Sequence, residues 1–121
     1  MSEIAGGPYR AWPVRTTDAT AKELIRYLVS EPDVIKRLSL NVMGHQVGSN
    51  NGACFVARAL VQRNGGGAPT LVGLAVDPAT NPQNWGGPSA AIVGNEIVFS
   101  VTGLAATTID WGIVITGEQF P

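Results

Sequence analysis

The residues of this 121-residue chain that could carry chemistry are few and widely spaced. His45 is the single histidine and Cys54 the single cysteine, and Asp110 has no second carboxylate at a recognisable spacing. Acid–base and nucleophilic catalysis both need a second group within hydrogen-bond reach, and a zinc site needs several Cys or His ligands. The sequence therefore predicts no catalytic residue, no metal site and no cofactor, and indicates a protein that is not an enzyme.

Glycines and tryptophans offer a second kind of chemistry, the binding of phosphates or sugars. Gly65–Gly67 is followed by no lysine and no helix-forming segment, so we expect a hairpin turn there rather than a phosphate loop. Trp12, Trp85 and Trp111 have rings that can stack on sugars. Trp111 lies among aliphatic residues and is expected in the core, whereas Trp85, in a loop rich in Pro and Gly, is expected to contact a ligand or a subunit.

Segments with period-two alternation predict the strands that position these residues. The alternation is clearest near the C-terminus, where Ile109, Trp111, Ile113 and Ile115 lie at every second position. Gly94-Asn95 between two apolar stretches predicts a two-residue hairpin, because both residues tolerate positive φ. Strands are predicted at residues 38–43, 53–63, 71–76, 96–102 and 109–116.

One face of these strands is expected to fill a core. Its predicted members are Phe55, Ala57, Ala59, Val61, Ile97, Phe99, Val101, Ile109, Trp111, Ile113 and Ile115.

Two further segments have a different pattern. Residues 77–90 hold three prolines and two glycines and are expected to form one long loop. Residues 20–30 fit a helix, because Thr20 and Glu23 have capping-box spacing, and they also fit a strand by alternation. The sequence leaves that choice open.

Regularly spaced short strands separated by Gly and Pro turns are typical of all-β proteins. We predict an antiparallel β-sandwich, jelly-roll-like or a small barrel, formed by residues 14–121. Residues 1–13, with Gly6-Gly7-Pro8 and Trp12-Pro13, are expected to be an extended N-terminal arm.

Charge and hydropathy exclude several classes of partner. A net charge of −1 gives no basic surface for nucleic acid. No apolar run approaches the roughly 20 residues that a membrane helix needs, and no signal peptide is recognisable, so no membrane partner is expected. Only 14% of the residues are charged, against about 25% in typical domains. We therefore expect a self-associating protein whose partner or oligomer contacts are Tyr9, Trp12, Val56, Leu60, Trp85, Val98 and Val114.

Three segments together resemble a known module. They are Thr16-Thr17-Asp18-Ala19-Thr20, Asn64-Gly65-Gly66 and the stretch VTGLAATTIDW at residues 101–111. Over residues 14–116 the chain resembles a small β-sandwich module of tailed-bacteriophage virion proteins, of the head-decoration and tail-fibre type. The resemblance implies a structural or binding module that is often oligomeric and has no catalytic residues.

From this resemblance we interpret the chain as a structural accessory protein of a virion, made in the cytoplasm of the bacterial host. The main interpretation is a capsid decoration or cement protein, a homotrimer that stabilises the shell by binding the major capsid protein or another virion protein. The alternative is a tail-fibre or receptor-binding module that recognises host surface glycans through loops around Trp85 and Asn50-Asn51.

Overall fold

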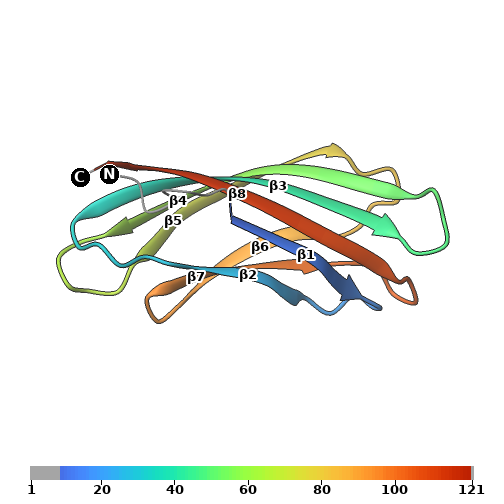
Figure 1. Ribbon diagram of the computed structural model, residues 1–121, viewed down its shortest axis with the longest axis horizontal. Coiled ribbons are helices and arrows are strands. Elements are labelled where there is room, and N and C mark those ends of the chain that lie inside the picture. The colour runs from blue at the N-terminus through green and yellow to red at the C-terminus, as the bar shows by residue number, and fades with distance from the viewer. Residues whose placement is uncertain (1–8, 121) are drawn as a thin grey trace.

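The computed structural model describes residues 9–120, and the side chains of residues 13–117, as two antiparallel sheets packed face to face (Figure 1). The larger sheet has the order β1-β8-β3-β4-β5 and the smaller sheet the order β2-β7-β6. The strands are β1 (Tyr9–Thr16), β2 (Lys22–Leu28), β3 (Val34–Gln46), β4 (Gly52–Arg63), β5 (Thr70–Thr80), β6 (Gly87–Val93), β7 (Glu96–Thr102) and β8 (Ile109–Phe120). The predicted all-β sandwich is confirmed.

Alternation of apolar and polar residues explains which face of each strand is buried. On β3 and β4 burial alternates almost without interruption, because successive side chains of a strand point to opposite faces. Every residue of the predicted core is buried between the two sheets. Gly94 adopts a positive φ of 60° and joins β6 to β7 in the predicted hairpin.

Within residues 20–30, which fitted a helix or a strand, residues 22–28 form strand β2. Leu24, Tyr27 and Val29 are buried against the larger sheet, and β2 pairs with β7 along most of its length, with one irregularity after Glu23. Hydrogen bonding to β7 satisfies the backbone of this segment in a way that an isolated short helix does not achieve. Tertiary pairing therefore outweighs the capping-box signal.

The loop predicted at residues 77–90 is shorter in the structure than the sequence predicted. Strand β5 continues to Thr80, β6 begins at Gly87, and only residues 81–86 connect them. Pro78 and Pro88 lie on β5 and β6, which are edge strands of their sheets. An edge strand tolerates proline because one side of its backbone needs no ladder hydrogen bond.

The N-terminal boundary of the sheet also differs from the expectation. Residues 9–13, assigned to an extended arm, belong to β1, which pairs antiparallel with β8 from Tyr9 opposite Ile115 to Thr16 opposite Ile109. The sheet thus begins before residue 14. The remainder of the predicted arm, residues 1–8, lies outside the described residues.

Four loops gather at one end of the sandwich, which we call the four-loop end. They are residues 17–21, 47–51, 81–86 and 103–108, and each follows an odd-numbered strand. Figure 1 shows them at the right, while β8 finishes toward the left. Strand β1 begins near the middle of the sandwich, where Tyr9 lies opposite Ile115. The four-loop end therefore points away from the end at which β8 finishes.

An aromatic cluster fills the core beneath the four-loop end. The Trp111 ring is fully buried, with its centroid 6.2 Å from that of Phe55 and 5.8 Å, edge to face, from that of Trp85. Trp111 Nε1 donates a hydrogen bond of 2.9 Å to Thr16 Oγ1, which satisfies the one polar atom of the buried indole.

Two glycines make room for this cluster. A Cβ on Gly44 would lie 2.9 Å from the Trp111 ring, and one on Gly87 would lie 2.8 Å from the Phe55 ring. Gly87 also has a φ of 82°, which strains any residue with a side chain. The contact of Gly87 on β6 with Phe55 on β4 thus limits how closely the two sheets approach each other.

Trp111→Ala should lower the free energy of unfolding by about 3–5 kcal/mol, because a large buried ring is replaced by a cavity. Urea denaturation measures the loss. Thr116→Ala, on the exposed side of the same strand, is the control and should change stability by no more than about 0.5 kcal/mol. Equal losses in the two variants would contradict the proposed core position.

Candidate binding surfaces

Loop 81–86 is held by a tryptophan that points inward. Trp85 is only 2% exposed. The Asn81 side chain binds the backbone of Trp85 through two hydrogen bonds of 2.9 Å: Nδ2 donates to Trp85 O, and Oδ1 accepts from Trp85 N. This burial leaves little of the Trp85 side chain available for the predicted contact with a glycan or a subunit. Its indole packs against Trp111, so burial of apolar surface decides its position, although Pro and Gly surround it in the sequence.

A chain of amide side chains joins loop 81–86 to loop 47–51. Gln83 Nε2 donates to Asn51 Oδ1 at 3.2 Å, and Asn51 Nδ2 donates to Gln46 Oε1 at 3.0 Å. Val47 N donates to Thr108 O at 2.9 Å, which ties loop 103–108 to the same group. The loops around Trp85 and Asn50-Asn51 thus meet, as the glycan-binding alternative requires, although the ring itself does not take part.

A row of ionisable residues crosses three strands beside these loops. Arg15 on β1 donates two hydrogen bonds to Asp110 on β8, at 2.8 and 3.0 Å. His45 on β3 lies opposite Asp110 in the strand register. The hydrogen bonds from Arg15 lower the pKa of Asp110, and the charge of His45 adds to this effect. No local pattern in the sequence predicted this row, because its members come together only through strand pairing.

A polar hollow of about 330 Å³ opens next to this row. It is lined by the segment Arg15–Lys22, except for Ala19. The Asp18 carboxylate accepts a hydrogen bond of 2.9 Å from Thr20 N, which shapes the turn. Val47 and Leu104, from two neighbouring loops, are 45% and 40% exposed. Hydroxyl, amide and carboxylate groups beside exposed aliphatic side chains can bind a ligand with many hydroxyl groups.

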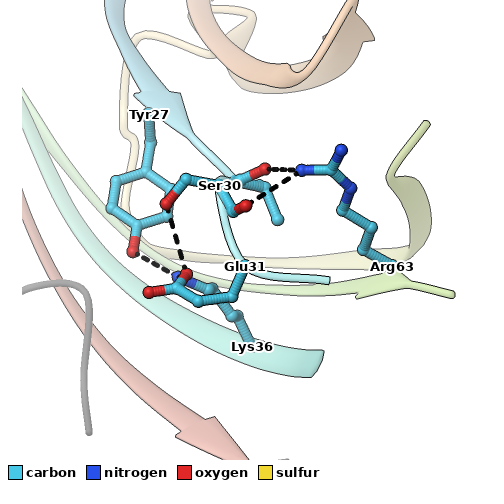
Figure 2. A network of polar contacts seen from close by, with 6 residues as sticks. Tyr27, Ser30, Glu31, Lys36 and Arg63 are labelled. Carbon is cyan, nitrogen blue, oxygen red and sulfur yellow. Dashed lines mark hydrogen bonds and ion pairs between the residues drawn. The ribbon is translucent and has the colours of Figure 1, made fainter. Parts of the chain in front are cut away.

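A different polar network lies at the opposite end and is internal to the sandwich (Figure 2). Lys36, which faces the core from β3, is 1% exposed. Its Nζ donates to Glu31 Oε1 at 3.0 Å and to Tyr27 Oη at 3.1 Å. Arg63 donates to the carbonyl oxygens of Val29 at 2.7 Å and Ser30 at 3.3 Å. These bonds fasten the segment between β2 and β3 to the larger sheet.

Burial lowers the pKa of Lys36, and the hydrogen bond and charge of Glu31 oppose that effect. A buried ammonium is costly unless its partners remain in place. We assign this network to folding, since its groups are satisfied by one another.

The other predicted contact residues fall into three groups. Val56, Leu60 and Val114 are half-buried on the outer face of the larger sheet. Val98 is 8% exposed on the smaller sheet, so little of its side chain is available to a partner. The side chains of Tyr9 and Trp12 lie outside the described residues, although their backbones belong to β1.

The remaining candidates for chemistry occupy ordinary positions. Cys54 is a partly buried free thiol on β4, and Gly65–Gly67 lies in the turn between β4 and β5, as predicted. Within residues 9–120 no group of three or more His, Cys, Asp or Glu side chains is placed to hold a metal ion, and no helix spans a bilayer.

Comparison with known proteins gives structural likeness without sequence similarity. The sequence matches no family model and no curated protein. The tailspike protein of Acinetobacter phage vB_ApiP_P1 has a similar fold, with a TM-score of 0.50 and 17% identity over 92% of this chain and 21% of the tailspike. The tailspike gp49 of Acinetobacter baumannii bacteriophage Fri1, a capsular polysaccharide depolymerase, gives a TM-score of 0.46 and 12% identity over 93% of this chain and 18% of gp49.

These likenesses refine the resemblance inferred from the sequence. The chain spans about a fifth of the length of either tailspike. The likeness to the tailspike of phage vB_ApiP_P1 supports a fold of tailed-phage virion proteins. The head-decoration form of the resemblance receives no support from them.

One expectation is corrected by the comparison. The scarcity of paired titratable groups predicted that the protein is not an enzyme, whereas gp49 of phage Fri1 is a capsular polysaccharide depolymerase. That prediction does not stand.

Glu31→Gln should lower the free energy of unfolding by about 1–3 kcal/mol, because the buried Lys36 ammonium loses its carboxylate. Lys36→Met should be neutral or stabilising, since it removes the charge together with its desolvation cost. Chemical denaturation of both variants at neutral pH measures the difference. A larger loss in Lys36→Met than in Glu31→Gln would show that the ion pair itself stabilises the fold.

The same network predicts a pH dependence. The pKa of Lys36 is lower in the folded chain than in the unfolded chain, so between the two values the unfolded state binds more protons. The contribution of Lys36 to stability therefore rises with pH through that alkaline window. Lys36→Met should lose this rise relative to the unsubstituted protein, as measured by denaturation at a series of alkaline pH values. Parallel stability curves would contradict the assignment.

Proposed function

We propose that this chain is a β-sandwich module of a tailed-phage virion component of the tail-fibre or tailspike kind, and that its four-loop end binds host surface glycans. In this proposal the module works as part of a homo-oligomer, a trimer. The fold likeness to a tailspike supports the class of protein.

The observation that carries the glycan-binding part is the composition of the four-loop end. Amide groups of loops 47–51 and 81–86 lie beside the Arg15–Asp110–His45 row and the polar hollow of about 330 Å³. Such groups match the hydroxyl-rich surface of a sugar, which offers both hydrogen-bond donors and acceptors. The loops are braced by hydrogen bonds among themselves, so little entropy is lost on binding.

The position of these loops also supports the proposal. Strand β8 finishes at the opposite end (Figure 1). A module attached through the end of β8 presents the four loops outward. Binding residues commonly lie on loops that a rigid scaffold positions.

Head decoration is the competing function. It requires contacts with a shell protein, and no feature of residues 9–120 specifies such a partner. The polar four-loop end and the tailspike likeness favour the glycan-binding alternative.

The test is binding to an array of bacterial capsular and lipopolysaccharide glycans. His45→Ala and Asn50→Ala, both at exposed positions, should each weaken binding of the recognised glycan about 3- to 10-fold, the equivalent of one hydrogen bond. Asn64→Ala, at the opposite end, is the matched control and should bind normally. Equal weakening in all three variants, or no glycan bound by the unsubstituted protein, would refute the proposal.

The heat resistance of virions distinguishes head decoration from glycan binding. Particles that lack this protein should keep the heat resistance of complete particles while losing attachment to host cells. Particles with normal attachment and lowered heat resistance would instead identify a decoration protein.

A further inference from the structure

We infer that an internal water molecule binds beneath loop 81–86, where it accepts a hydrogen bond from Trp85 Nε1 and donates one to Gln83 Oε1. In this inference the water is a structural part of the four-loop end. The argument starts from two buried polar atoms and does not depend on glycan binding.

Two buried side-chain atoms in the described part of the chain have no hydrogen-bond partner in the protein. They are Trp85 Nε1, which is a donor, and Gln83 Oε1, which is an acceptor. Both belong to loop 81–86, two positions apart. Leaving a buried polar atom unpaired is costly, and most such atoms in folded proteins are paired with a protein group or with ordered water. A partner outside the chain is therefore expected.

Other buried polar side chains of the sandwich find their partners within the chain. Trp111 Nε1 donates a hydrogen bond of 2.9 Å to Thr16 Oγ1. The buried Lys36 ammonium donates two hydrogen bonds to side chains. Trp85 differs from both, although it is only 2% exposed. This difference indicates that the partner of its indole nitrogen is not a protein group.

The hydrogen bonds that hold loop 81–86 in place are made by other atoms. Both polar atoms of the Asn81 side chain bind the Trp85 backbone. Asn84 N donates to Asn81 O at 3.1 Å, and Gly86 N donates to Gly103 O at 3.4 Å. A loop that moved to bring a protein group to either unpaired atom would break some of these bonds. A small molecule beside the loop is the less costly partner.

The chemistry of the two atoms selects water as that molecule. The indole N–H needs an acceptor, whereas the Gln83 carbonyl oxygen needs a donor. A metal cation accepts no hydrogen bond and a halide donates none, whereas water does both, and internal waters typically make about three hydrogen bonds. Because both atoms are shielded from solvent, a hydroxyl group of a glycan bound at the surface does not reach them.

The water holds the Gln83 amide from its second side. Gln83 Nε2 donates to Asn51 Oδ1 at 3.2 Å, and Asn51 Nδ2 donates to Gln46 Oε1 at 3.0 Å. With its Oε1 bonded to the water, the Gln83 amide uses both of its polar atoms and keeps one orientation. The chain of amides between the loops is thereby connected to the buried Trp85 ring.

A high-resolution crystal structure of the unsubstituted protein tests the inference directly. We expect one ordered water within hydrogen-bond distance of both Trp85 Nε1 and Gln83 Oε1. In solution, the indole proton of Trp85 should show a nuclear Overhauser effect to a long-lived bound water. A crystal structure in which no single water binds both atoms, or in which a protein group binds Trp85 Nε1, would overturn the inference.

Paired substitutions test whether one molecule connects the two atoms. Trp85→Phe removes the donor and Gln83→Met removes the acceptor, so either change breaks the bridge. Each should raise the equilibrium constant of unfolding, measured by urea denaturation. The double variant should raise it about 3- to 10-fold less than the product of the two single effects.

The matched control combines Gln83→Met with Trp111→Phe. Trp111 Nε1 has its partner within the chain, so these two effects should multiply. Effects that multiply in the Trp85 pair as well would contradict a shared water. Should Trp85→Phe fail to fold, the crystal structure of the unsubstituted protein still decides.

Discussion

The packing of Trp111 between the two sheets is the interaction on which the rest of the structure depends. Its ring touches aromatic neighbours from β4 and from loop 81–86, and its indole nitrogen is bonded to Thr16 on β1. Because Gly44 leaves no Cβ in the way, the ring lies directly against the backbone of β3. One side chain thereby sets the positions of several strands and of a loop. Each van der Waals contact of the ring is weak, but the sum of these contacts is large.

The four-loop end is a consequence of this cluster. Trp85 buries its ring beside Trp111, which draws loop 81–86 down onto the sandwich and brings Gln83 within hydrogen-bond distance of Asn51. The tryptophan acts as an anchor, and the polar side chains that remain at the surface are those available for recognition. The opposite end is closed differently, by the buried ammonium of Lys36 and its carboxylate and phenol partners.

The four-loop end carries polar side chains and exposed aliphatic groups, and it points away from the end at which β8 finishes. Association into the proposed trimer would present several four-loop ends together. Weak binding of each loop end to a repeating polysaccharide would then sum to strong attachment, because later contacts form at high effective concentration.

The sequence by itself determined the strands and the core, since the alternation that predicts β3, β4, β7 and β8 is a local property with a period of two residues. It also indicated the hairpin at Gly94 and the virion class of fold. Only the tertiary structure decided that residues 22–28 form a strand, that Trp85 is buried, and that Arg15, Asp110 and His45 form one row. Those outcomes depend on which strands pair and in what register. Strand pairing joins residues that are far apart in the chain, so a local sequence pattern cannot predict it.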